Sequence, residues 1–414
     1  MAKLHSAKII HLTCVMVLTL PILTGCWDRL EIEDRAVVLG VSIDKAPPES
    51  ANQETEVAHV EGANPIPPED MIRVAVQIAI PGRIPLGPGE SGGGGGGGGG
   101  KSSAANTVWV LHVVGHSIDD ALMNLQQQVA SSLFFGHLRV IVISEEVAKK
   151  GLENINDYFR RNSEVRRMAW ILVAKGEAMQ FLTAAPKLER VPTLYLLSTL
   201  EEGFRMGKFP QDFIGMFWSN SSKKGQEGFL PYVELKKENN VEIAYFKGPK
   251  MVGSTSPLEI GAYMAIKGIN PAGYRVIVQL NGAADTVITA ATHRKARYSV
   301  RIAEGRPHFT IHIAFEQNVE EKYSEHIGID NQEILSNIEK KQAQVAVEYF
   351  EQFIRKTQEA HSDIFGFGEY IRAKRPAFWN RNVKTKEKWQ EMYKDAEFDV
   401  TVTMKIRRVG MKAR

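Results

Sequence analysis

Two cysteines, Cys14 and Cys26, are the only thiols of the 414-residue chain. Both lie within the first 26 residues, so neither a disulfide framework nor a cysteine-based zinc site can form further along the chain. Thiol chemistry is therefore confined to the N-terminus, where Cys26 follows a Leu-Thr-Gly sequence. A thiol there can serve as a nucleophile or as an attachment point for another group.

The residues before Cys26 have the composition of an export signal. Lys3 and Lys8 form a positively charged start, and the mostly apolar residues 9–23 match a signal-peptide core. They fall short of the ~20 apolar residues that a membrane span requires. The Leu-Thr-Gly-Cys sequence resembles the lipobox of bacterial lipoproteins, whose cysteine carries an S-diacylglycerol and an N-acyl chain after cleavage. We therefore expect a signal peptide at 1–25 and membrane attachment through lipidated Cys26, with an ordinary secretory signal as the alternative.

Cleavage at this position would change the chemistry of the mature chain. Cys14 would be removed and Cys26 would become a thioether, which leaves no free thiol and excludes cysteine catalysis. Loss of Lys3 and Lys8 would lower the formal charge from +3 to +1. Such a nearly neutral chain lacks the concentrated basic charge of nucleic-acid-binding proteins, so we expect no nucleic-acid partner.

A glycine-rich stretch produces an accidental phosphate-binding pattern. Residues 95–102 match G-x-x-x-x-G-K-S, but they overlap nine consecutive glycines at 92–100, which satisfy any glycine pattern. A phosphate loop also needs a following helix, whereas a strand is expected at 107–115. We interpret 81–103 as a flexible Gly-rich loop.

Histidine pairs at a spacing of four are the remaining metal candidates. His112 and His116 lie on and after an expected strand, and His308 and His312 share one face of another. Neither pair has a third ligand nearby in sequence, so we expect no metal site and no bound cofactor. His137 has no adjacent nucleophile, and no G-x-S-x-G motif occurs in the chain. A pair of converging carboxylates, as in a glycosidase, remains open.

The helices and strands that would position these residues follow one pattern before residue 190 and another after it. Hydrophobic residues make up 43% and charged residues 24%, as in ordinary globular proteins. Strands alternate with helices over 26–190, and a helix begins at Ser117 with Asp120 as its capping partner. This alternation predicts an N-terminal mixed α/β sheet domain.

The pattern changes beyond residue 190. We expect a middle region of helices and short strands at 191–265, including a strand at 262–265. From 266 to 414, strands follow one another without helices, which predicts an antiparallel sheet. One long amphipathic helix at 331–361, capped by Asp330 and Glu333, packs against that sheet. The fold class is therefore multi-domain α+β.

Three stretches together resemble the Ger(x)C family, the lipoprotein C subunits of nutrient germinant receptors in spore-forming bacteria. The first begins at Gly25, the second covers 133–146, and the third begins at 362, directly after the long helix, and ends with the strand at 400–406 and Gly410. The resemblance implies a structural or interaction role for the following motif residues: Trp27, Asp28, Gly136, His137, Asp363, Gly366, Gly368 and Trp389.

The resemblance also implies a function. The chain would be a non-enzymatic subunit, anchored through Cys26 on the outer face of the spore inner membrane. It would act with two integral-membrane subunits, A and B, in a receptor that triggers germination in response to nutrients. A substrate-binding lipoprotein of a transporter, or a cell-wall hydrolase, are the alternatives.

Overall fold

The computed structural model describes the chain in nine segments, with residues 13 and 16 in addition: 34–47, 49–50, 70–80, 107–184, 191–235, 241–270, 273–279, 286–323 and 331–408. Cys26, Trp27 and Asp28 lie outside the described residues, as do the Gly-rich loop and nearly all of the expected signal peptide. None of the helices in the described segments is both long and apolar enough to cross a membrane.

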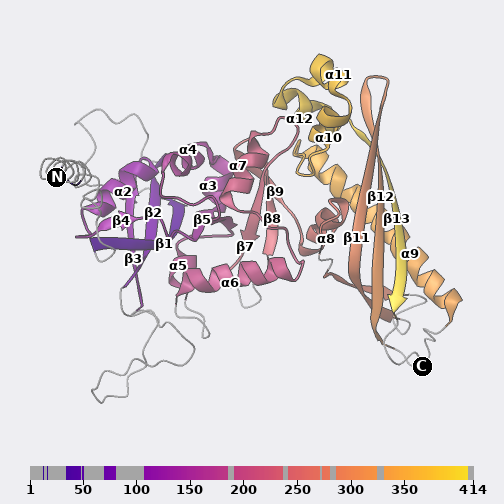
Figure 1. Ribbon diagram of the computed structural model, residues 1–414, viewed down its shortest axis with the longest axis horizontal. Helices are drawn as coiled ribbons and strands as arrows, with labels where there is room; N and C mark the ends of the chain where they lie inside the picture. Colours follow the sequence, from indigo (N-terminus) through magenta and orange to yellow (C-terminus); the bar gives the residue numbers. More distant parts are fainter. Residues whose placement is uncertain are drawn as a thin grey trace, which may run out of the picture.

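The N-terminal half is built around a nine-stranded sheet (Figure 1). Its strand order is β3-β2-β1-β5-β6-β7-β8-β9, with β4 beside β1. The strands are β1 Arg35–Lys45, β2 Ile72–Ala79, β3 Val108–Gly115, β4 Ser132–Phe134, β5 Val140–Ser144, β6 Trp170–Ala174, β7 Phe229–Val233, β8 Val241–Lys247 and β9 Lys250–Ser254. β1, β5, β6 and β7 are parallel, while β2, β3, β8 and β9 pair antiparallel at the two sides.

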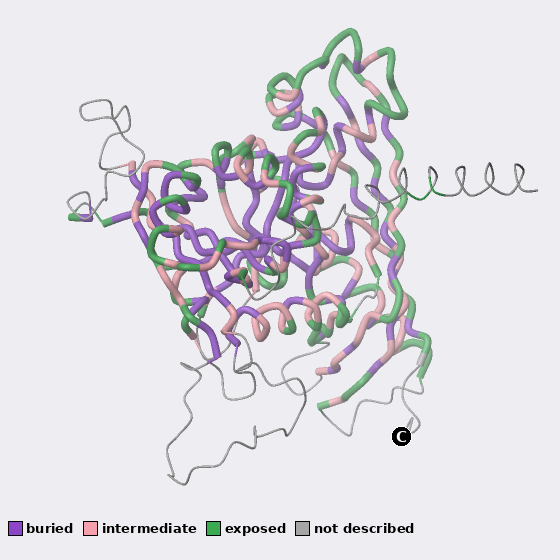
Figure 2. The backbone as a smooth tube through the Cα atoms, turned by 60° about the vertical axis from the view of Figure 1, so that its left-hand side comes forward, coloured by how far each residue is buried: buried purple, intermediate pink, exposed green. Residues whose placement is uncertain are grey.

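Helices cover both faces of this sheet. One face carries α2 Ile118–Gln126, α3 Glu145–Lys150, α4 Glu153–Arg161 and α7 Ile214–Ser222, and the other carries α5 Gln180–Thr183 and α6 Pro192–Arg205 (Figure 1). On β5, Ile141 and Ile143 join the core of the first face, whereas Val140 and Val142 join that of the second. Alternate side chains of a strand point to opposite faces, so a strand covered on both sides is apolar throughout. Figure 2 shows that buried residues gather in the interior of the molecule.

The C-terminal half contains a four-stranded sheet and a long helix. The strands, in the order β10-β11-β12-β13, are β10 Arg275–Gln279, β11 Thr286–Ala303, β12 Arg306–Lys322 and β13 Glu397–Arg408. α8 Pro257–Ile266 and α9 Gln332–Glu359 pack on one face, followed by α10 Phe367–Lys374, α11 Pro376–Phe378, the π-helix η6 Trp379–Val383, and α12 Lys386–Lys394. The α+β fold with a long amphipathic helix against the second sheet is confirmed.

The second sheet is not antiparallel throughout. β10, β11 and β12 are antiparallel neighbours, but β13 runs parallel to β12. The connection between β12 and β13 contains α9, which crosses the sheet before the chain returns. A helical crossover of this kind is what a parallel pair requires.

Two local predictions need correction, and a third is confirmed. Residues 262–265 belong to α8, because Ser256 and Glu259 form a complete capping box and Pro257 occupies the first turn. The N-cap of the long helix is Asn331, whose side chain accepts the Glu333 N–H, whereas Asp330, the expected cap, lies outside the described residues. The helix at Ser117 begins as expected, with the Ser117 hydroxyl accepting the Asp120 N–H.

The stretch 191–265 is divided between the two halves. β7, β8 and β9 extend the first sheet, whereas α8 packs in the core that includes β12. Sheet pairing therefore does not set this stretch apart as a third unit, and the boundaries at 190 and 265 stay predictions.

Candidate functional site at the junction of the two sheets

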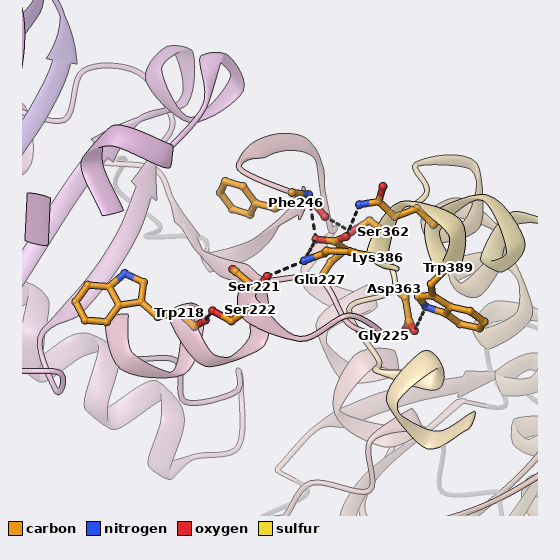
Figure 3. Close-up of polar contacts among 12 residues, drawn as sticks. Trp218, Ser221, Ser222, Gly225, Glu227, Phe246, Ser362, Asp363, Lys386 and Trp389 are labelled. Atoms are coloured by element: carbon orange, nitrogen blue, oxygen red, sulfur yellow. Dashed lines mark hydrogen bonds and ion pairs between the residues drawn. The ribbon is translucent and has the colours of Figure 1, made fainter. Parts of the chain in front are cut away.

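The carboxylate of Asp363 organises the loop that follows α9. One oxygen, Oδ1, accepts the Gly366 N–H at 2.8 Å, and Oδ2 accepts the Gly368 N–H and the Trp389 indole N–H, both at 2.9 Å. Gly366 has φ = +77°, which a glycine adopts without strain, and it starts α10. Three N–H groups thus converge on one buried side chain, and Figure 3 shows the contact from Trp389.

Burial and hydrogen bonding act on Asp363 in opposite directions. Burial raises the pKa of its carboxyl to about 6, although the N–H donors around it lower that pKa. The side chain has no exposed oxygen with which to take a proton from a substrate, because it is 2% exposed. Its role is that of a structural acceptor.

Two glycines allow the loop to touch the N-terminal half. A Cβ on Gly225 would lie 2.3 Å from the Gly368 carbonyl carbon, and a Cβ on Gly368 would lie 2.5 Å from the Trp389 ring. The Glu369 N–H donates to Gly225 O at 3.0 Å, and the Gly225 N–H donates back to Glu369 Oε1 at 2.9 Å. The backbones are in direct contact, which only residues without a side chain permit.

Glu227 forms the second half of the junction. It is buried, and its carboxylate accepts the Gly248 N–H at 3.0 Å and the Gln390 amide at 2.6 Å. Lys386 Nζ lies 3.0 Å from Glu227 Oε2 (Figure 3). Burial raises the pKa of Glu227, and the nearby Lys386 ammonium opposes that shift. Because Gly248 follows β8 while Gln390 and Lys386 lie on α12, Glu227 links the first sheet to the C-terminal helices.

Backbone contacts complete this junction cluster, which consists of Gly225, Glu227, Asp363, Gly366, Gly368, Lys386 and Trp389. The Glu227 N–H donates to Asp363 O at 2.8 Å, and the Ser362 hydroxyl donates to Phe246 O at 2.5 Å. The cluster therefore holds together residues more than a hundred positions apart. The cluster therefore joins the two sheets structurally, since its polar groups are bonded to one another.

The second motif lies elsewhere. Gly136 is buried under the Phe134 ring, since a Cβ there would come within 2.3 Å of that ring. The Phe134 ring also contacts the Arg35 guanidinium, 4.4 Å from its centroid, and the edge of His137, 5.9 Å away. These residues surround the start of β1, at the opposite end of the molecule from α10 and α12 (Figure 1). The motif residues thus form two sites: Asp363, Gly366, Gly368 and Trp389 come together, and Gly136 and His137 do not join them.

The histidines have contacts that sequence reasoning missed. His308 Nε2 lies 2.6 Å from Asp399, and its Nδ1 lies 3.1 Å from Glu397, because β13 pairs with β12 in parallel. His312 lies 3.0 Å from the Thr401 hydroxyl. In the segments that the structure describes, no three His, Cys, Asp or Glu side chains are grouped to hold a metal ion. Sequence reasoning also missed Glu227. Nothing in the residues next to it in the sequence indicates the groups that it contacts in the structure.

Taken together, the fold and its junction define a class: an α+β protein of two sheet modules, whose motif residues join the modules. Two family models together cover nearly all of the chain. "Spore germination protein N-terminal domain" matches residues 28–235, and "Spore germination B3/ GerAC like, C-terminal" matches residues 242–410. The chain belongs to this Ger(x)C spore germination family. The boundary between the two matches falls between β7 and β8, inside the first sheet.

Individual relatives span between 72% and 97% of the chain. Spore germination protein KC of Bacillus subtilis (strain 168) is 24% identical over 425 residues, covering 97% of this chain and 96% of the relative. Spore germination protein GerQC of Bacillus cereus is 23% identical and covers 72% of this chain and 81% of its own length. The crystal structure of the GerBC protein matches with a TM-score of 0.52 at 17% identity, over 81% of this chain and 93% of that one. This last likeness confirms the fold.

Proposed function

We propose that this chain is the lipid-anchored C subunit of a nutrient germinant receptor. The observation that carries the proposal is its match to both domains of the spore germination family along nearly its full length. The subunit would be attached through Cys26 to the outer face of the spore inner membrane. There it would act with integral-membrane A and B subunits in nutrient-triggered germination.

The proposed role requires binding and no catalysis. The two most buried carboxylates of the junction, Asp363 and Glu227, are already engaged by N–H donors and by Lys386. A joint of this kind keeps the two modules at a constant orientation, which suits a subunit that presents one surface to a partner. The motif around Gly136 and His137 lies beside the start of β1, which is the first described strand after Cys26 in the sequence.

The anchor is tested by replacing Cys26 in spores. We expect Cys26→Ala to leave the membrane fraction and nutrient-triggered germination to fall while growth is unchanged. Cys14→Ala is the matched control, because this cysteine lies in the expected signal peptide and its loss removes a thiol without removing the attachment site. Normal germination by Cys26→Ala at normal protein levels would refute the anchored role. If germination were untouched but uptake of a solute fell, a transporter lipoprotein would be the better assignment.

A further inference from the structure

The core of the C-terminal half is split into two parts. Val278, Val287 and Ile338 belong to a small apolar cluster at one end of the second sheet, while Phe315 and Phe350 belong to the main core. A cavity of about 470 Å³ lies against both parts. This volume is within the range of about 300–1,000 Å³ that small-molecule sites occupy.

The cavity follows from the direction of α9. This helix crosses the second sheet obliquely and packs mainly on β13, so it moves away from β10 and β11 (Figure 1). α8 covers the sheet on the other side, with Leu258, Gly261 and Ala262 in the cavity wall. The space between the two helices is therefore a wedge that neither of them fills.

Apolar side chains are exposed around the opening. Four of the large hydrophobic residues in contact with solvent line this cavity, with exposed fractions between 43% and 67%: Leu258, Val276, Ile277 and Val345. They come from three separate elements, α8, β10 and α9. A contiguous apolar patch around a cavity indicates a site for an apolar ligand.

The charged side chains in the cavity wall are all positive. Arg294, which is buried, and Lys341, at the opening, line the cavity, and none of the described lining residues is Asp or Glu. Arg294 Nε donates to Ile269 O, and burial lowers the pKa of its guanidinium to about 10. Gln317, Gln342 and Thr289 are joined by side-chain hydrogen bonds across the cavity floor. The site therefore combines an apolar wall with a positive potential.

We propose that this α8–α9 cavity binds a fatty acid, an apolar chain that ends in a carboxylate. The chain would fill the gap between the two parts of the core, and the carboxylate would lie near Arg294 or Lys341. An uncharged or cationic amphiphile of the same length would lose the electrostatic attraction. This inference is independent of the germination role.

Binding can be measured on the full-length chain in phosphatidylcholine nanodiscs, with empty nanodiscs as the baseline. Equilibrium dialysis would compare decanoate with 1-decanol and decyltrimethylammonium. We expect decanoate to bind most tightly, Ala346→Phe to abolish binding by filling the cavity, and Lys341→Gln to weaken it by about two- to fivefold. Gln344→Phe and Lys340→Gln are matched controls, because both residues are exposed on α9 outside the cavity and both variants should bind as wild type does.

Three results would overturn the proposal. The first is no decanoate binding above the nanodisc baseline, and the second is unchanged binding by Ala346→Phe. The third is equal binding of all three amphiphiles, which would remove the role of the cations. If Ala346→Phe impaired germination in spores although decanoate did not bind, the cavity would be a docking site for a protein partner.

Discussion

Replacing Gly368 by alanine tests whether the junction is as tightly packed as its geometry indicates. The new Cβ would lie 2.5 Å from two atoms of the Trp389 ring and 2.6 Å from Gly225 Cα. Ordinary contacts between carbon atoms begin near 3.5 Å, so the ring or the Gly225 backbone must move by nearly 1 Å. Neither the ring nor the Gly225 backbone can move freely, because the indole N–H is hydrogen-bonded to Asp363 and the Gly225 backbone is hydrogen-bonded to Glu369.

The cost has two parts. Overpacking of a well-packed site destabilises by about 1–3 kcal/mol. Displacement of Trp389 would also break its bond to Asp363 and leave a buried N–H without a partner, which adds about 1–3 kcal/mol. We therefore expect Gly368→Ala to lower the free energy of unfolding by about 2–6 kcal/mol.

Urea denaturation followed by tryptophan fluorescence measures this change, and Trp389 is one of the six tryptophans that contribute to the signal. Gly305→Ala is the control, because Gly305 has φ = +77° but no atom within 4 Å of its added Cβ. That variant should lose only the cost of the left-handed conformation, about 1–2 kcal/mol. If Gly368→Ala cost no more than Gly305→Ala and left the native fluorescence unchanged, the tight junction would be refuted.

Three further predictions concern Glu227 and Asp363 in the junction cluster and Ser256 at the start of α8. Glu227→Ala should lower stability by about 3–5 kcal/mol in urea denaturation, since it removes the counter-charge of Lys386 and leaves the Gly248 N–H and the Gln390 amide without their acceptor; a loss below about 1 kcal/mol would contradict this. Folding raises the pKa of Asp363 to about 6 from roughly 3.9 in the unfolded chain, so the folded state holds its proton more tightly. The stability of wild type relative to Asp363→Asn should therefore fall as the pH rises from about 4 to about 6, and a pH-independent difference would show that the pKa is not raised. Ser256→Ala should cost about 1 kcal/mol of thermal stability by removing the capping box of α8, and an unchanged melting temperature would count against that box.

Local signals in the sequence predicted the elements whose causes are local. The apolar runs of β5 and β6, the cap at Ser117 and the amphipathic pattern of α9 each depend on residues within one or two turns or strands. The strand expected at 262–265 was wrong because an apolar run of four residues fits either conformation, and the cap at Ser256 decides the outcome. Asp363, Gly366, Gly368 and Trp389 were identified from their resemblance to a family motif, and the structure brings them together.

Only the tertiary structure decided how distant segments meet. The pairing of β7 with β6, the parallel pairing of β13 with β12 and the contact of Glu227 with Lys386 all join residues far apart in sequence. The cavity between α8 and α9 likewise depends on the angle at which a long helix crosses a sheet. Such features leave no periodicity in the sequence, because hydrogen bonds between strands and the burial of charged groups depend on spatial neighbours. The sequence by itself therefore determined most of the elements and confined the two thiols to the N-terminus, and the packing of the two modules decided the junction and the cavity.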